Sequence, residues 1–207
     1  FERPYAGTPS GVVLAGQRGW TAPAGAPQGH WLVHTYAQSP FELARNRWGH
    51  GQFVAAKQPA TVELALPFSE SAFIVDIAVD SEGTPVLEPD IGSISLMAGD
   101  RTLLAIQISW SDPLRTNGWS LHLKASDAAG AMQRLTVPDP SFHNRGLGLW
   151  YRVTVHLDRR DGRIEAIEIF NHTSLSEHAL FEPHALYLGP GGLPAVEAIR
   201  LTAELRD

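Results

Sequence analysis

The chain has 207 residues, a net charge of −6 and no cysteine. This length suits one β-sandwich domain over residues 1–207, and the lack of cysteine excludes disulfides and thiolate catalysis. Acidic and basic residues are mixed along the chain, so we expect no nucleic-acid partner. No apolar run approaches the ~20 residues of a membrane helix, so we expect no membrane span.

The first third of the chain has short strand patterns between irregular segments. An apolar run at residues 12–14 predicts a short strand among glycines and prolines, and alternation over residues 30–36 predicts a second. Residues 37–51 have no strand period and predict an irregular loop. Further strands are expected at 52–56, 61–68 and 71–80.

The middle of the chain predicts two antiparallel hairpins. Gly99-Asp100 joins two alternating runs in the first, and residues 126–130 join two such runs in the second. The strands expected on either side of these turns are 91–98, 102–110, 119–124 and 132–137.

The clearest pattern in the chain is LWYRVTVHLDRRDGRIEAIEIFN, residues 149–171. Apolar and polar residues alternate on both sides of Asp161-Gly162, the strongest short hairpin signal available. A hairpin alone is marginal in water, so other strands must cover its apolar face.

The rest of the chain predicts one helical turn at 177–180, a short strand at 186–188 and a closing strand at 196–205. Many short strands and no convincing helix indicate an all-β fold. We therefore expect a two-sheet antiparallel β-sandwich.

Three segments resemble one superfamily when they are taken in order. FERPYAGTPSG...LAGQRGW, WYRVTVHLDRRDGRIEAIEIFN and VEAIRLTAE are similar to the start, the penultimate hairpin and the last strand of concanavalin A-like (laminin G-like) jelly rolls from secreted bacterial carbohydrate-active proteins. The resemblance implies a jelly roll, a secreted or cell-surface location, and a polysaccharide or oligosaccharide partner on a cupped sheet or its rim loops. It does not choose an activity, because this superfamily includes lectins, carbohydrate-binding modules, glucanases and polysaccharide lyases.

Sugar recognition needs flat apolar surfaces flanked by hydrogen-bonding groups. Several tryptophans lie beside turn or loop residues, and Trp48 has the most polar neighbours. Alternatively, a tryptophan of this kind has a structural role and anchors the core or a loop. The expected ligand-binding residues are Arg45, Arg47, Trp48, His50 and Trp119.

An enzyme is the second possibility. His34, Tyr36 and His50 could form the base and acid of a lyase that removes the C5 proton beside a uronate. Arg45 or Arg47 would then neutralise the uronate carboxylate. Alternatively, His34 and Tyr36 are polar residues on a solvated sheet face.

A glycoside hydrolase needs paired carboxylates. Glu63 and Asp76 fall on polar faces of strands adjacent in sequence, and Glu168 on another strand. The Glu-x-Asp-x-Glu strand of the laminarinase-type glucanases is absent. Glu165 and Glu168 would point to opposite faces of a strand, which argues against this activity.

The resemblance also implies a structural calcium ion. In similar proteins the first glutamate and an acid before the last strand can bind it, and Glu2 and Glu197 occupy those places here. Their carboxylate oxygens suit a hard cation. If no calcium ion binds there, both residues are ordinary surface acids.

Three hypotheses on function follow. The first is a secreted, non-catalytic carbohydrate-binding domain. The second is a polysaccharide-cleaving enzyme, either a lyase or a glycoside hydrolase. The third is a laminin G-like protein-interaction module, which would carry a flat apolar surface patch.

Overall fold

The computed structural model describes residues 11–27, 29–35, 52–56, 58–68, 70–79, 90–110, 118–137, 148–171, 173, 175, 178–189, 192 and 194–204. Within them the regular elements are all β-strands, and every strand pair is antiparallel. None of the described segments is a helix long and apolar enough to cross a membrane.

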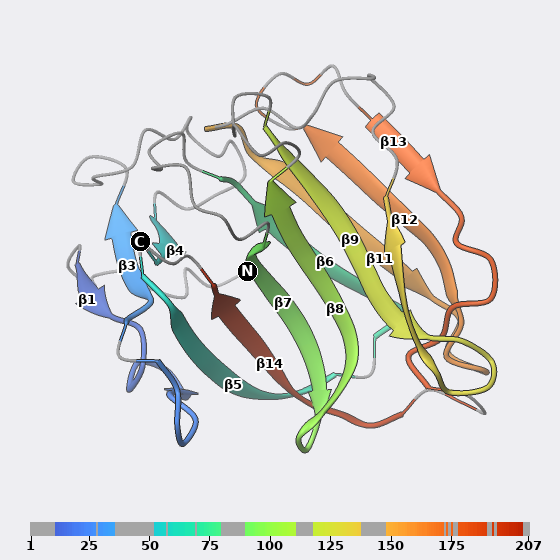
Figure 1. Ribbon diagram of the computed structural model, residues 1–207, viewed down its shortest axis with the longest axis horizontal. Helices are drawn as coiled ribbons and strands as arrows, with labels where there is room; N and C mark the ends of the chain where they lie inside the picture. Colours follow the sequence, from blue (N-terminus) through green and yellow to red (C-terminus); the bar gives the residue numbers. More distant parts are fainter. Residues whose placement is uncertain are drawn as a thin grey trace.

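The largest sheet has seven strands in the order β10-β9-β8-β7-β14-β5-β2. Its long strands curve along their length and lie in front in Figure 1. β14, near the end of the chain, lies between two strands from its first half, because it pairs with β7 on one side and with β5 on the other. The strands of this sheet are β2 (Trp20–Thr21), β5 (Ala60–Phe68), β7 (Asp90–Ala98), β8 (Arg101–Trp110), β9 (Trp119–Ser126), β10 (Met132–Thr136) and β14 (Val196–Ala203).

A second sheet has four strands in the order β13-β12-β11-β6 and lies behind the first in Figure 1. Its strands are β6 (Ala72–Ile77), β11 (Tyr151–Leu157), β12 (Ile164–Asn171) and β13 (His178–Phe181). A third, small sheet has the order β1-β3-β4. It is formed by β1 (Val12–Val13), β3 (Leu32–Thr35) and β4 (Gln52–Ala55).

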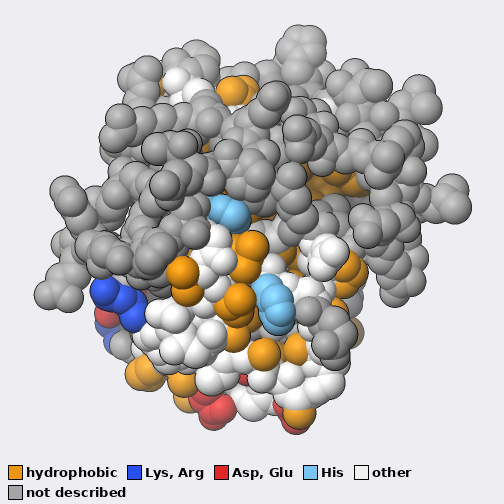
Figure 2. Space-filling view, turned by 90° about the vertical axis from the view of Figure 1, so that its left-hand side faces the viewer, with side chains coloured by type: hydrophobic (Ala, Val, Ile, Leu, Met, Phe, Trp, Pro, Cys, Tyr) orange, Lys and Arg blue, Asp and Glu red, His pale blue; other side chains and the backbone are white. Residues whose placement is uncertain are grey.

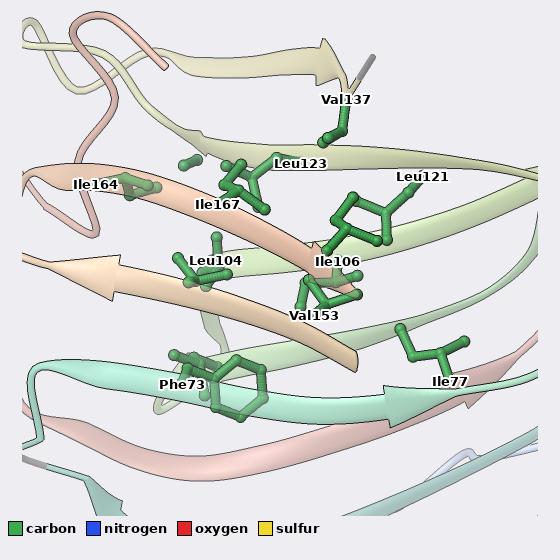
Figure 3. Packing of buried hydrophobic residues seen from close by; sticks show 14 of the residues in the cluster. Phe73, Ile77, Leu104, Ile106, Leu121, Leu123, Val137, Val153, Ile164 and Ile167 are labelled. Carbon is green, nitrogen blue, oxygen red and sulfur yellow. The ribbon is translucent and has the colours of Figure 1, made fainter. Parts of the chain in front are cut away.

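The main core lies between the two larger sheets. Side chains of Ile106 and Leu121 from one sheet pack with those of Val153 and Ile167 from the other (Figure 3). Because successive side chains of a strand point to opposite faces, the alternation in sequence sends one apolar set into this layer. Each fully buried aliphatic side chain contributes about 1.5–3 kcal/mol.

The three predicted hairpins are confirmed, as β7–β8, β9–β10 and β11–β12. In the β11–β12 turn, Gly162 has φ 72°, a conformation that glycine adopts without strain. Its N–H donates to Asp158 O, and Asp158 N–H donates to Arg163 O. The Arg160 guanidinium bonds the Asp158 carboxylate across the turn and lowers the pKa of Asp158 to about 2.

Two local predictions are wrong. Residues 178–181 form strand β13, paired with β12, where a helical turn was expected. Cross-strand pairing with β12 outweighs the local helical preference there. The short strand predicted at residues 186–188 is not formed. Within this segment only Tyr187 makes isolated bridges, to Ser126 and Arg163. The all-β antiparallel architecture is confirmed and is consistent with a β-sandwich, whereas the jelly-roll topology stays a prediction.

Candidate functional site

Most of the predicted site residues lie outside the described part of the chain. These are Glu2, Tyr36, Arg45, Arg47, Trp48 and His50. Their predicted roles therefore stay predictions. Those that the structure describes are His34, Trp119 and Glu197.

His34 lies in β3 and is only 5% exposed. Its ring stacks on Phe53 of the neighbouring strand with centroids 5.6 Å apart, and Phe53 in turn meets Trp150 edge-on. For His34 the interpretation as a polar residue on a solvated face is wrong, because it packs among aromatic rings. Figure 2 shows the side of the molecule that carries this small sheet, where hydrophobic and histidine side chains lie close together.

Trp119 belongs to the main core. Its side chain is 0% exposed and meets the Tyr151 ring of the opposite sheet edge-on, with centroids 5.4 Å apart. The prediction of Trp119 as a sugar platform is corrected by this burial, because an indole enclosed between two sheets offers no face to a ligand. It begins β9, so its position beside a loop in sequence did not place it on the surface.

Glu197 lies near the start of β14, and its Oε2 accepts a hydrogen bond from Gly99 N at 2.9 Å. Calcium takes six to eight oxygen ligands. Among the described residues no group of three or more His, Cys, Asp or Glu could hold a metal ion. Because Glu2 lies outside the described residues, the calcium site stays a prediction.

The two carboxylates of the hydrolase hypothesis are not brought together. Glu63 lies on the seven-stranded sheet, where it forms an ion pair with Arg200. Asp76 lies on the four-stranded sheet, where the Arg152 guanidinium donates to both of its oxygens at 2.8 and 3.0 Å. Since each is engaged by its own arginine on a different sheet, they cannot act as a catalytic pair.

The structure assembles a different polar surface, on the side of the seven-stranded sheet that points away from the four-stranded sheet. We call it the polar face. Leu104 and Ile106 of β8 point into the core, so Ala105 and Gln107 point to this face. Strand registers set its side chains in two rows across six strands, and only Ala105 among them is apolar. The rows are Thr61–Thr202–Ser93–Gln107–His122–Thr136 and Glu63–Arg200–Ser95–Ala105–Lys124–Arg134.

Hydrogen bonds hold the centre of the polar face in place. His122 Nε2 lies 2.6 Å from Ser109 Oγ, and His122 Nδ1 lies 2.9 Å from Thr136 Oγ1. A hydroxyl can donate or accept, so both contacts are compatible with either tautomer of the ring. The imidazole is thereby fixed between strands β8 and β10.

Gln107 and Asp90 form a second contact on this face. Gln107 Nε2 donates to Asp90 Oδ2 at 2.6 Å, and this contact sets the orientation of the amide because a carboxylate accepts only from a donor. Gln107 Oε1 and Asp90 Oδ1 are buried and have no hydrogen-bond partner. Each needs a donor, which a buried water molecule can supply.

The polar face was missed in the sequence, although its signal was there. Residues 102–110 and 119–124 were both predicted as strands, and Ala105, Gln107 and Ser109 alternate with aliphatic residues. The set of neighbours across the sheet depends on strand order, however. β14 lies between β7 and β5, which no local pattern indicates.

A second polar cluster lies on the outer surface of the four-stranded sheet. Glu168 Oε1 lies 2.7 Å from His178 Nε2, and Glu168 Oε2 lies 3.4 Å from His156 Nε2. The hydrogen bond from His178 is the main cause that lowers the pKa of Glu168 below its usual value of 4.5. His178 is on the edge strand β13, so this contact ties that strand to β12.

We expect Glu168→Gln to lower the unfolding free energy at pH 6 by about 0.2–1 kcal/mol, as for exposed ion pairs. The folded-state pKa of Glu168 is lowered, so its contribution is present above the unfolded pKa and is lost as the pH falls through the folded pKa. The difference from the wild type should therefore shrink as the pH falls below 4.5. Urea unfolding at several pH values measures it, with Glu165→Gln on the same strand as control. An equal loss in the control, or a loss independent of pH, would contradict this role.

The polar face thus combines fixed hydrogen-bonding groups, two buried acceptor oxygens without a partner, and cations toward its ends. These are groups that recognise a hydroxylated or charged ligand. The chain matches no model of a known protein family and no curated protein sequence.

Proposed function

We propose that this chain is a secreted polysaccharide-binding domain with a concanavalin A-like jelly-roll topology, and that it holds its ligand on the polar face. One observation carries the proposal: two rows of side chains, polar at every position except Ala105, cross six strands of one sheet. Ser95, Gln107 and His122, at the centre of these rows, are buried. The accessible part of the polar face is toward its ends, where Lys124 and Arg200 are partly exposed and Arg134 is exposed.

The dimensions of the polar face suit an extended ligand. Neighbouring strands lie about 4.8 Å apart, so a row across six strands spans roughly 24 Å. Such a row presents donors and acceptors at regular intervals to a chain of sugar units. Binding that uses several weak polar contacts along a polymer gives affinity without a deep pocket.

Calorimetry with neutral and acidic polysaccharides tests the proposal. We expect binding to at least one of them, and a loss of about tenfold in affinity for Gln107→Leu, the equivalent of one hydrogen bond. Gln58→Leu makes the same chemical change at an exposed position outside the polar face and should bind as the wild type does. Binding to no polysaccharide, or equal effects of the two substitutions, would contradict the proposal.

A second candidate function is cleavage of a uronate polysaccharide by β-elimination. It follows from the predicted base and acid His34, Tyr36 and His50, of which only His34 lies in the described part of the chain. Both nitrogens of the buried His122 ring contact hydroxyls, so the base that takes the C5 proton would be one of the predicted residues. Incubation with alginate or pectate distinguishes the two functions, because an elimination produces an unsaturated sugar that absorbs in the ultraviolet.

We do not favour a protein-interaction module. Ile74 and Leu180 are 56% and 60% exposed on the outer surface of the four-stranded sheet. They belong to one cross-strand row in which Thr154 and Glu168 separate them. The exposed apolar side chains at this place therefore do not join into one patch.

A further inference from the structure

Two cations face each other at one end of the polar face. Lys124 of β9 and Arg134 of β10 are directly opposite in the antiparallel register, which brings their Cβ atoms to about 5 Å. Like charges in this arrangement destabilise a sheet. Two adjacent cations contrast with the chain as a whole, which carries a net charge of −6.

Neighbouring groups neutralise this pair only in part. At the other end of the same row Arg200 has Glu63 as its partner. By contrast, Lys124 forms no ion pair with any residue that the structure describes. The Arg134 guanidinium forms an ion pair with Asp90 at 3.7 Å from Nη2 to Oδ1. This distance is too long for a hydrogen bond, so Arg134 keeps donors for another anion.

The same strands place hydrogen-bonding groups beside the two cations. His122 and Thr136 are in the next row, on the same two strands as Lys124 and Arg134. His122 is held there by Ser109 and Thr136. A ligand that lies along the rows would thus meet a cationic end and a neutral, hydroxyl-rich centre.

We infer that the polysaccharide is acidic, and that one of its anionic substituents, a carboxylate or a sulfate ester, binds between Lys124 and Arg134. This inference rests on the proposed function and adds the class of ligand to it. An anion at this place removes the repulsion between the two cations and accepts charge-assisted hydrogen bonds from both. Arg134 keeps its planar fork of donors for a planar anion, while Lys124 acts as a point charge.

The test measures binding of the full chain to four polymers by affinity electrophoresis and calorimetry. Alginate and pectate carry carboxylates, heparin carries sulfate esters as well, and dextran carries no charge. The variants are Lys124→Met, which removes the charge and keeps an apolar stem, and Arg134→Gln. The control is Arg163→Gln, which makes the same charge change in the β11–β12 turn at a side chain that is also 47% exposed.

We expect binding to an acidic polymer that weakens with added salt, and a loss of about tenfold for each of Lys124→Met and Arg134→Gln, but none for Arg163→Gln. Lys124→Met should keep or slightly raise the melting temperature, since it relieves the repulsion. Preference for uronates over heparin assigns the anion to a carboxylate, and the reverse preference assigns it to a sulfate ester. Binding to dextran alone, or equal losses in all three variants, would overturn the inference and leave the proposed function standing. Binding to none of the polymers would overturn both.

Discussion

Replacing Trp119 by alanine should lower the unfolding free energy by about 3–5 kcal/mol, the range for large aromatic side chains deleted from a core. The indole is fully buried and meets Tyr151 across the space between the two larger sheets. Its removal leaves a cavity that the strands on either side can close only in part. Urea unfolding followed by fluorescence and by circular dichroism measures the loss.

Trp119→Phe is the matched variant. It keeps an aromatic ring and should therefore lose clearly less stability than Trp119→Ala. If Trp119→Ala instead unfolded at the same urea concentration as the wild type but no longer bound polysaccharide, Trp119 would be a ligand platform, as the sequence alone had suggested.

Replacing Gly92 by alanine should cost about 1–3 kcal/mol, the usual range for overpacking. Gly92 lies in β7 opposite β14, and a Cβ atom there would lie 2.4 Å from Thr202 O. The atom in the way is backbone, so the two strands must move apart where hydrogen bonds join them. Thermal unfolding of the variant should show a melting temperature lower by several degrees.

Gly189→Ala provides the control for this substitution. A Cβ atom at Gly189 would meet only the side chain of Pro194, at an ordinary contact distance of 3.4 Å. The control should therefore stay near the wild type in stability. A loss in Gly92→Ala no larger than in Gly189→Ala would show that β7 and β14 do not approach as closely as described.

Strands that follow one another through a tight turn were predictable from the sequence. In β11 and β12 the alternation is long and Asp161-Gly162 fixes the turn, so both the strands and their pairing follow from local chemistry. β2 has only two residues, too few to show a period. The order of strands in the sheets depends on contacts between distant segments, which leave no local signal.

The candidate site was less predictable for the same reason. A tryptophan beside a loop was expected at the surface, yet Trp119 is enclosed because β9 lies inside the seven-stranded sheet. His34 was weighed for its chemistry, but its surroundings are aromatic. The polar face needs the registers of five strand pairs at once, and only the three-dimensional arrangement supplies them.

We propose that the functional surface of this protein is the polar face of its seven-stranded sheet. Mapping backbone amide chemical shifts by NMR during titration with an oligosaccharide from the best-bound polymer tests it most directly. We expect shifts concentrated in β8, β9 and β10, around Gln107, His122 and Lys124, with little change in β11 and β12. Shifts concentrated on the outer surface of the four-stranded sheet, with β8 and β9 unchanged, would contradict it.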